Sequence, residues 1–393
     1  MEKGYALWRC TAGAAAARTG DEMSGPALLL AGLAVTGSAA SASSLLAGIM
    51  IAAAVGGPLF GVLLDRSSRP GRLLTGALAG YASALVVILV ALGRLPNALT
   101  VPIAVFAGLL GPALSGGWTS QLPRVVPPEA LPRANSLDAM TFNVAALVGP
   151  ALAGAVAGLA GATAGVIVST VLICLALPTA WALPAAGDRA HTRRRTPVSA
   201  DLAEGFRAIC RIRPLARATT ASAISCVGEG ILVACAPLLG VQVLGAAGHG
   251  VILLSGIAVS ALTANALLTR HPRLLRPETV IWCSTLVLAA ALLLAATGHP
   301  ALLIAAVVLA GIGEGPQLTA LFAIRHREAP ERLRGQIFTT GASLKLTAFA
   351  VGAALAGPLA VRSLPGALLT AAGFQLLAAL SCALLCKGLD GNE

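Results

Sequence analysis

Six charged residues interrupt long apolar stretches of this sequence, where a charge cannot be explained as ordinary surface solvation. Arg18, Asp21 and Glu22 lie in a mostly apolar run that extends from about residue 12 to residue 35. Three others stand alone in similar runs: Glu229, Glu314 and Lys345. Carboxyl groups in such surroundings can take up and release protons, and a nearby cation can neutralise them.

The composition indicates that these stretches lie in lipid. The chain is 57% hydrophobic and 11% charged, with a mean hydropathy of +0.85, whereas soluble domains carry about 25% charged residues. The apolar runs are too long, and alternate too little, for a transmembrane β-barrel. A helix needs about 20 apolar residues to cross the bilayer. The sequence predicts an all-α integral membrane protein with twelve transmembrane helices, at 11–36, 41–64, 72–93, 99–120, 136–159, 161–182, 218–240, 249–269, 279–297, 300–324, 336–360 and 366–386.

The six charges fall at similar depths in these spans. Asp21 and Glu22 lie about ten residues into the first span, which at 1.5 Å per residue is close to the bilayer centre. Glu229, Glu314 and Lys345 reach a comparable depth in spans seven, ten and eleven. A charge at that depth costs at least about 2.5 kcal/mol and normally faces a cavity or another charge. We therefore expect these residues and Arg18 to form a proton-coupling and substrate cavity.

Two simpler roles remain open. Arg18 precedes Asp21 by three residues and Glu22 by four, so it can pair with one acid on the same helix face. Lys345 can serve only to neutralise an acid across the cavity. If all six groups share one cavity, four acids face two bases, and burial then favours protonation of at least one acid.

The basic residues are distributed as in a multi-pass membrane protein. Most of the 27 lysines and arginines fall in alternate connections, including eight between Arg189 and Arg217, whereas the intervening loops hold Arg94 and Arg362. This asymmetry places both termini and the long middle loop in the cytoplasm, and it argues against a nucleic-acid surface. We expect a protein of the plasma membrane, in bacteria the inner membrane.

The chain divides into two halves around a polar linker. We expect six-helix bundles at 1–182 and 218–393, joined by a basic cytoplasmic linker at 183–217. Within the linker, Leu202, Phe206 and Ile209 share one face of an amphipathic helix that suits a membrane surface. The segment from Ala107 parallels the one from Ala310 at an offset near 203, which indicates pseudo-symmetric bundles with a substrate site between them.

Three motifs resemble those of one family. GVLLDRSSRPGR at 61–72 is similar to the loop signature of the major facilitator superfamily, with Ser68 in place of its middle glycine. GPALAG at 149–154, which GAALAGP at 352–358 parallels, resembles the glycine-proline motif of that superfamily's exporters, and PRANSL before it is similar to bacterial drug-efflux members. The fourth span lacks the arginine that many antiporters carry there.

The resemblance implies gating roles for a set of motif residues. Asp65 would act on the N-terminus and dipole of a neighbouring helix, although a charged anchoring loop is the simpler alternative. The glycines and prolines would permit a bend and close helix contact, and ordinary tight packing is the alternative there. Asp138 is expected at an interface or gate. The complete gating set is Gly61, Asp65, Arg66, Arg69, Asp138, Gly149, Pro150, Gly154, Gly357 and Pro358.

The function that follows is secondary active transport by alternating access. The resemblance favours proton-coupled efflux of a small organic compound, with an acid as proton carrier. The alternative is proton-coupled uptake of a polar metabolite, which the 4% aromatic content favours slightly, because multidrug cavities often use stacking surfaces. The sequence shows no metal-ligand spacing, phosphate loop or nucleophile motif. We therefore expect no enzyme activity, cofactor or metal, and a monomer whose partners are a small solute, protons and lipid.

Overall fold

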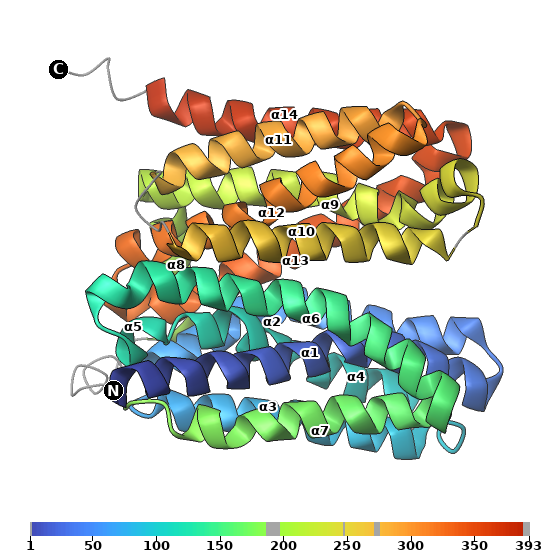
Figure 1. Ribbon diagram of the computed structural model, residues 1–393. Coiled ribbons are helices and arrows are strands. Elements are labelled where there is room, and N and C mark those ends of the chain that lie inside the picture. Colours follow the sequence, from blue (N-terminus) through green and yellow to red (C-terminus); the bar gives the residue numbers. More distant parts are fainter. Residues whose placement is uncertain (1, 186–196, 247, 271–275, 388–393) are drawn as a thin grey trace. The chain divides into compact units, whose positions relative to one another are not determined.

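The computed structural model describes residues 2–185, 197–246, 248–270 and 276–387. Every regular element within these ranges is helical (Figure 1). The basic stretch at 189–195 and Arg273 lie outside the described residues. The elements are α1 (Glu2–Thr36), α2 (Ala39–Arg66), α3 (Pro70–Ala91), α4 (Asn97–Pro112), the π-helix η1 (Ala113–Gly117), α5 (Leu122–Val125), the 3-10 helix η2 (Pro128–Ala130), α6 (Leu131–Ala160), α7 (Ala162–Trp181), α8 (Val198–Arg211), α9 (Arg213–Leu244), α10 (His249–Arg270), α11 (Pro277–Ala296), α12 (Pro300–Glu328), the 3-10 helix η5 (Glu331–Leu333), α13 (Arg334–Arg362) and α14 (Leu364–Lys387).

The helices have the length and apolarity that a bilayer requires. In the described part of the chain, 11 helices can cross a membrane by both criteria. α1, with 35 residues, is also of membrane length, but the charged residues Arg18, Asp21 and Glu22 interrupt its apolar sequence. Each predicted span falls on one of these twelve helical segments, so the predicted all-helical membrane fold is confirmed.

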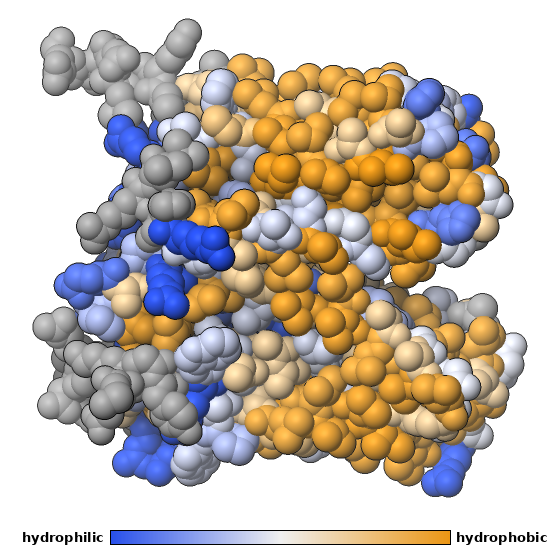
Figure 2. All heavy atoms as spheres, in the orientation of Figure 1, coloured by the Kyte–Doolittle hydropathy of each residue, from blue (hydrophilic) through white to orange (hydrophobic). Residues whose placement is uncertain are grey.

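The helices present apolar side chains to their surroundings, as lipid-facing surfaces do. Leu159 is 91% exposed and Val361 is 90% exposed. On the face that Figure 2 shows, hydrophobic residues cover the middle of the helices, and hydrophilic residues gather mainly near their ends. In hydrocarbon such a surface has no solvation penalty, and helices satisfy their own backbone hydrogen bonds there.

Local sequence signals end some helices and leave others intact. Gly161, with φ 91°, separates α6 from α7, and Gly245 ends α9 in the left-handed conformation with φ 84°; both are backbone conformations that glycine adopts without steric penalty. Pro150 and Pro358 lie inside α6 and α13 without interrupting them, which is common in transmembrane helices.

By contacts, the chain forms two compact units that do not follow a single cut in the sequence. Unit 1 consists of residues 1–134, 144–206 and 330–343, and unit 2 consists of 135–143, 207–329 and 344–393. The first part of α13 thus belongs to the unit built mainly from the first half of the chain. All contacts described below lie within one unit.

The internal repeat is visible in equivalent helix crossings. In unit 1, Gly108 of α4 packs against the carbonyl oxygen of Ile49 of α2 so closely that a Cβ would clash. In unit 2, Gly311 of α12 packs in the same way against the carbonyl oxygen of Ile257 of α10. Gly108 and Gly311 are related by the offset found in the sequence, so the repeated segments make the same contact in both units.

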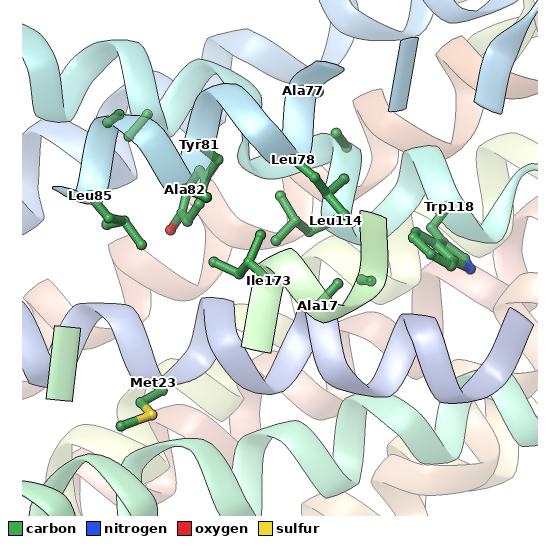
Figure 3. Close-up of a cluster of buried hydrophobic side chains, with 14 of the residues drawn as sticks. Ala17, Met23, Ala77, Leu78, Tyr81, Ala82, Leu85, Leu114, Trp118 and Ile173 are labelled. Atoms are coloured by element: carbon green, nitrogen blue, oxygen red, sulfur yellow. The ribbon is translucent and has the colours of Figure 1, made fainter. Parts of the chain in front are cut away.

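The core of unit 1 lies among α1, α3, η1 and α7. Its largest buried side chains include Trp118, Tyr81, Leu78 and Leu114, each 0% exposed. Figure 3 shows Tyr81, Leu114 and Ile173 together on one side of α1, while the side chain of Met23 leaves α1 on another side. This packing fixes the orientation of the acidic stretch of α1.

Candidate functional site

Asp21 lies near the middle of α1 and accepts a hydrogen bond from a buried tyrosine. The Tyr81 hydroxyl of α3 donates to Asp21 Oδ1 at 2.7 Å. The same hydroxyl lies 3.0 Å from Ser24 Oγ, one turn further along α1. Tyr81 is fully buried, so the packing of α1 against α3 holds this donor in place. The arrangement fixes the orientation of the Asp21 carboxyl group.

Glu22 has a different environment from its neighbour. It is exposed, and among the described residues it forms no hydrogen bond or ion pair. Gly149 of α6 packs against it: a Cβ at Gly149 would lie 2.7 Å from Glu22 Cβ and 2.9 Å from the Met23 nitrogen. The glycine of the predicted gating motif therefore permits α6 to approach α1 at the acid itself.

The Arg18 guanidinium binds the segment at residues 114–119, nearly a hundred residues later in the chain. Its Nε donates to the Leu114 carbonyl at 3.3 Å, and its guanidinium also contacts Thr119 Oγ1 at 2.9 Å and the Ser115 carbonyl at 3.5 Å. Leu114 and Ser115 belong to the π-helix η1, whose wider turn leaves carbonyl groups open to other donors. Arg18 is buried at 2% exposure, and these bonds direct its guanidinium toward η1. Its pairing with Asp21 or Glu22 stays a prediction.

In unit 2, Glu229 lies near the middle of α9 within a polar network. Ser225 Oγ, one turn earlier, lies 3.1 Å from Glu229 Oε1 and 2.8 Å from Gln375 Oε1 of α14. The Cys226 thiol lies 3.5 Å from Glu229 Oε2. Gln317 of α12 donates to Ser225 Oγ at 3.1 Å. The network therefore joins three helices at the position of the acid.

Glu314 and Lys345 are the other mid-helix charges of unit 2. Glu314 lies on α12 and Lys345 on α13, and both are half-buried. Neither forms a hydrogen bond or an ion pair among the described residues, but the charges of Glu229, Glu314 and Lys345 act on one another electrostatically. Unit 2 thus brings the three predicted residues into one electrostatic group with two acids and one base.

The loop motif after α2 contacts the start of α13. Asp65 accepts a hydrogen bond from the Gly335 N–H at 2.7 Å and another from the Gln336 N–H at 2.9 Å. Gly61, one turn earlier, packs so closely against Gln336 and Thr339 that a Cβ would clash. The unpaired N–H groups at a helix N-terminus attract anions, so a carboxylate and a glycine together permit this contact.

The linker helix α8 contacts the same region, where the loop after α2 meets the start of α13. Arg66 donates to Asp201 Oδ2 of α8 at 2.7 Å, and the Gln336 side chain donates to the Leu202 carbonyl at 3.1 Å. Glu204 forms an ion pair with Arg332. Of the predicted apolar face of α8, Ile209 is buried, whereas Phe206 is 49% exposed.

Charges around Asp65 reach beyond its hydrogen bonds. Burial lowers the pKa of the Arg124 guanidinium in α5, while the carboxylates of Asp65 and Glu331 raise it and Arg334 lowers it further. Arg124 remains protonated near neutral pH, because the ordinary pKa of an arginine lies far above neutrality. It therefore adds a permanent positive charge beside Asp65.

The remaining motif residues are more dispersed. Asp138 is fully buried in unit 2. Arg69 is exposed between α2 and α3. The four other positions lie at exposed sites on α6 and α13, and a Cβ at either glycine would meet nothing within 4 Å; they are Pro150, Gly154, Gly357 and Pro358. Close helix contact thus occurs at Gly149 but not at these glycines.

The sequence analysis missed several polar residues of these sites. Tyr81, Ser225, Gln317 and Gln375 were overlooked because none carries a formal charge. The available signal was their position: each is a polar residue inside an apolar span, where hydrogen-bonding groups need partners. Asp201 was overlooked because the linker reads as basic overall.

The family comparison gives the class of protein. The profile of the Major Facilitator Superfamily matches residues 10–275, and an uncharacterized MFS-type transporter, y4rN, of Sinorhizobium fredii (strain NBRC 101917 / NGR234) is 28% identical over 340 residues, covering 82% of this chain and 81% of the relative. The chain belongs to the major facilitator superfamily, and it is a multi-pass membrane transporter, not an enzyme.

Solved structures share this fold at low sequence identity. A bacterial homologue of the iron transporter ferroportin, in an outward-facing state, has a TM-score of 0.77 at 17% identity and covers 97% of this chain and 99% of its own. A human organic anion transporter has a TM-score of 0.77 at 14% identity over 97% and 100% of the two chains. The Escherichia coli fucose:proton symporter has a TM-score of 0.75 at 13% identity over 96% and 98%.

Proposed function

We propose that the protein is a proton-coupled secondary transporter that exports a small organic compound by alternating access. The observation that carries the proposal is the state of Glu22 and Glu314: both are mid-helix acids with no hydrogen bond or ion pair among the described residues. An ionised carboxylate without a partner is unfavourable in a membrane interior. A proton or a cationic group of a cargo removes that penalty, and exchange between them couples the two fluxes.

The four acids differ in their proposed roles in proton exchange because their surroundings differ. Glu22 and Glu314, which lack donors, gain most from a proton. Asp21 and Glu229 have hydroxyl donors from Tyr81 and Ser225 that favour the ionised form. Lys345 offsets one negative charge in unit 2, while Arg18 serves α1 packing through η1. We assign proton exchange to these acids, both those without donors and those with hydroxyl donors: Asp21, Glu22, Glu229 and Glu314.

The gate is proposed at the contact between α2 and α13. Alternating access requires a contact that holds in one state and breaks in the other, and the two hydrogen bonds from Gly335 and Gln336 to Asp65 can break without unfolding either helix. Arg66 and the linker helix α8 support this closed state. Gly149 permits α6 to pack closely against α1 beside Glu22. We propose that a movement of α6 thereby changes the surroundings of this proton-binding acid.

The orientation follows from the basic loops. The positive-inside rule places both termini and the Asp65 loop at the cytoplasmic face of the plasma membrane. We retain the two six-helix halves, 1–182 and 218–393, as the moving bodies, with 183–217 as linker and the transporter as a monomer. Export rests on the resemblance of GPALAG to the exporter motif, and the likeness to drug-efflux members rests on PRANSL.

Uptake of a polar metabolite by proton symport is the second candidate. The low aromatic content of 4% favours it, since few aromatic faces are available for stacking against drugs. A fucose:proton symporter has the same fold, but at 13% identity the likeness concerns the fold alone. The same acids would serve either direction.

Transport by membrane vesicles distinguishes the two directions. Inverted vesicles energised by respiration, with a pH-sensitive dye, are given a panel of antibiotics and metabolites. Export predicts that at least one compound releases protons from vesicles with the wild-type protein but not from vesicles with Glu314→Gln. The exposed Glu129 of η2 gives a matched control, and Glu129→Gln should behave as the wild type.

The opposite outcome is equally specific. If no compound releases protons, and right-side-out vesicles accumulate a polar solute when acidified outside, the export proposal is wrong and symport replaces it. If a compound moves and Glu314→Gln and Glu22→Gln both retain full proton coupling, the assignment of the acids is wrong.

A further inference from the structure

Ser225 is the centre of the buried network beside Glu229. Ser225, Gln317 and Gln375 are at most 3% exposed. The Gln375 amide binds Ser225 at two points: its Nε2 donates to the Ser225 carbonyl at 3.0 Å, and its Oε1 lies 2.8 Å from Ser225 Oγ. These two contacts fix which end of the amide is the acceptor, since a carbonyl oxygen can bond only to its nitrogen end.

The hydroxyl of Ser225 has one proton and two acceptors within reach. Gln317 donates to Ser225 Oγ at 3.1 Å, so the hydroxyl proton is directed elsewhere. It can point to Glu229 Oε1 at 3.1 Å or to Gln375 Oε1 at 2.8 Å. An ionised carboxylate is a stronger acceptor than an amide oxygen, and a protonated carboxyl group is a weaker one.

We infer that Ser225 is a positioning residue that sets the proton affinity of Glu229, by donating its hydroxyl to the ionised carboxylate and turning to Gln375 when Glu229 is protonated. The serine keeps its own proton throughout, and the proton that binds Glu229 comes from solvent. The inference rests on the proposed role of Glu229 as a proton carrier. It adds that the network holds the carboxylate in one orientation in both states.

Close packing at Gly228 is required for the contact between Gln375 and Ser225. A Cβ at Gly228 would lie 2.9 Å from Gln375 Nε2 and 2.9 Å from the Ala371 carbonyl. The residue next to Glu229 in α9 therefore has to lack a side chain for α14 to bring Gln375 to Ser225.

Other groups around Glu229 are charged or titratable and enter its behaviour. They include Cys226 on the same helix, Glu314 on α12 and Lys345 on α13. The buried Arg325 of α12 interacts electrostatically with Cys226 and Lys345. α14 contributes the neutral Gln375. α10 and α11, which also pack against α9, carry no charged residue between their first and last turns. The Ser225 hydroxyl is thus an uncharged donor that acts on Glu229 beside these charges.

The test uses infrared spectroscopy of the full-length protein reconstituted in lipid, without any cargo. The stretching band of a protonated carboxyl group disappears as that group ionises, and the band of Glu229 is the one missing from Glu229→Gln. For Ser225→Ala we expect the midpoint of this band to differ from that of the wild type, because the hydroxyl that contacts Glu229 Oε1 is lost. Ser225→Thr keeps a hydroxyl and should restore the wild-type midpoint.

Ser222 supplies a matched control one turn earlier on α9. It is buried at 1% exposure, and its hydroxyl has no hydrogen-bond partner in the described part of the chain. Ser222→Ala should therefore leave the Glu229 midpoint unchanged, whereas a general loosening of α9 would move it in both alanine variants.

Three results overturn the inference: an unchanged midpoint in Ser225→Ala, an equal shift in Ser222→Ala, or no band lost in Glu229→Gln between pH 4 and pH 10. The vesicle assay separates this failure from failure of the proposed function. If Glu229→Gln abolishes proton coupling while Ser225→Ala leaves the midpoint unchanged, Glu229 remains a proton carrier and only the role of Ser225 is wrong.

Discussion

The Asp65 carboxylate caps a helix that begins 269 residues after it in the chain: it accepts the Gly335 N–H of α13 at 2.7 Å and, through its other oxygen, the Gln336 N–H at 2.9 Å. These N–H groups have no partner within their own helix. Charge-assisted hydrogen bonds of this type are stronger than neutral ones. The contact therefore stabilises the association of α2 with the first part of α13.

Asp65→Asn should weaken this contact. The amide has no charge and can accept at only one atom, so a loss of about 1.5 kcal/mol is expected, a factor of about ten in the opening equilibrium. Thr340 of α13 is 6% exposed, and none of the described residues forms a hydrogen bond with its hydroxyl, so Thr340→Cys is a suitable reporter. Thiol labelling of that cysteine should become about tenfold faster. The background replaces by serine the cysteines that are exposed among the described residues, Cys174, Cys210 and Cys283, and also Cys386.

An unchanged labelling rate in Asp65→Asn would show that the carboxylate does not hold the contact. Asp65→Glu is the informative partner variant, because it keeps the charge but moves it by one methylene group. We expect an intermediate rate for it.

Gly61→Ala should act on the same contact by steric exclusion. A Cβ at Gly61 would clash with Gln336 and Thr339, whereas a Cβ at Gly76 of α3 would meet nothing within 4 Å. Gly61→Ala should therefore speed the labelling of Thr340→Cys, while Gly76→Ala should leave it unchanged and, through helix propensity, stabilise α3 by up to about 1 kcal/mol. Equal effects of the two substitutions would contradict the packing argument.

Arg66 and Asp201 should be energetically coupled. Their side chains are 16% and 4% exposed and form an ion pair at 2.7 Å, so removing one partner leaves a poorly solvated charge. Arg66→Gln or Asp201→Asn should each lower the free energy of unfolding by about 1–2 kcal/mol, between surface and buried pairs. Thermal unfolding in detergent measures this, and additive losses in the double variant would argue against coupling.

Tyr81→Phe should impair proton coupling while the fold is retained. Phenylalanine fills the same buried volume but removes the hydrogen bond to Asp21, which is worth about 1.5 kcal/mol or more for a charged acceptor. In proton-release assays on inverted vesicles, the pH optimum should differ from that of the wild type, because Asp21 loses its hydroxyl donor. The same optimum in the variant and the wild type would mean that Asp21 does not exchange protons.

The sequence predicted the helices well because their cause is local. Twenty apolar residues specify a membrane-length helix whatever surrounds it, so each predicted span falls on a helix. Mid-span charges such as Glu314 were identifiable for the same reason, as exceptions to an apolar pattern.

The contacts could not be predicted, because they depend on residues far apart in the chain. The spacing of Arg18 suggests only Asp21 and Glu22 as partners, yet the carbonyl groups of Leu114 and Ser115, nearly a hundred residues later, also accept from it. Likewise, Gln375 and Gln317 are neutral residues that become meaningful only when α12 and α14 place them against Ser225. Spacing along one helix cannot reveal acceptors that another helix presents.

The central claim is that cargo and protons compete for acids in the middle of the helices. The most direct measurement counts the protons that purified protein releases in weakly buffered detergent when it binds the cargo found in the vesicle assay. We predict release by the wild type and by Glu129→Gln, and clearly less release by Glu229→Gln and Glu314→Gln. No release by the wild type, or the same release by both mid-helix variants, would contradict the account.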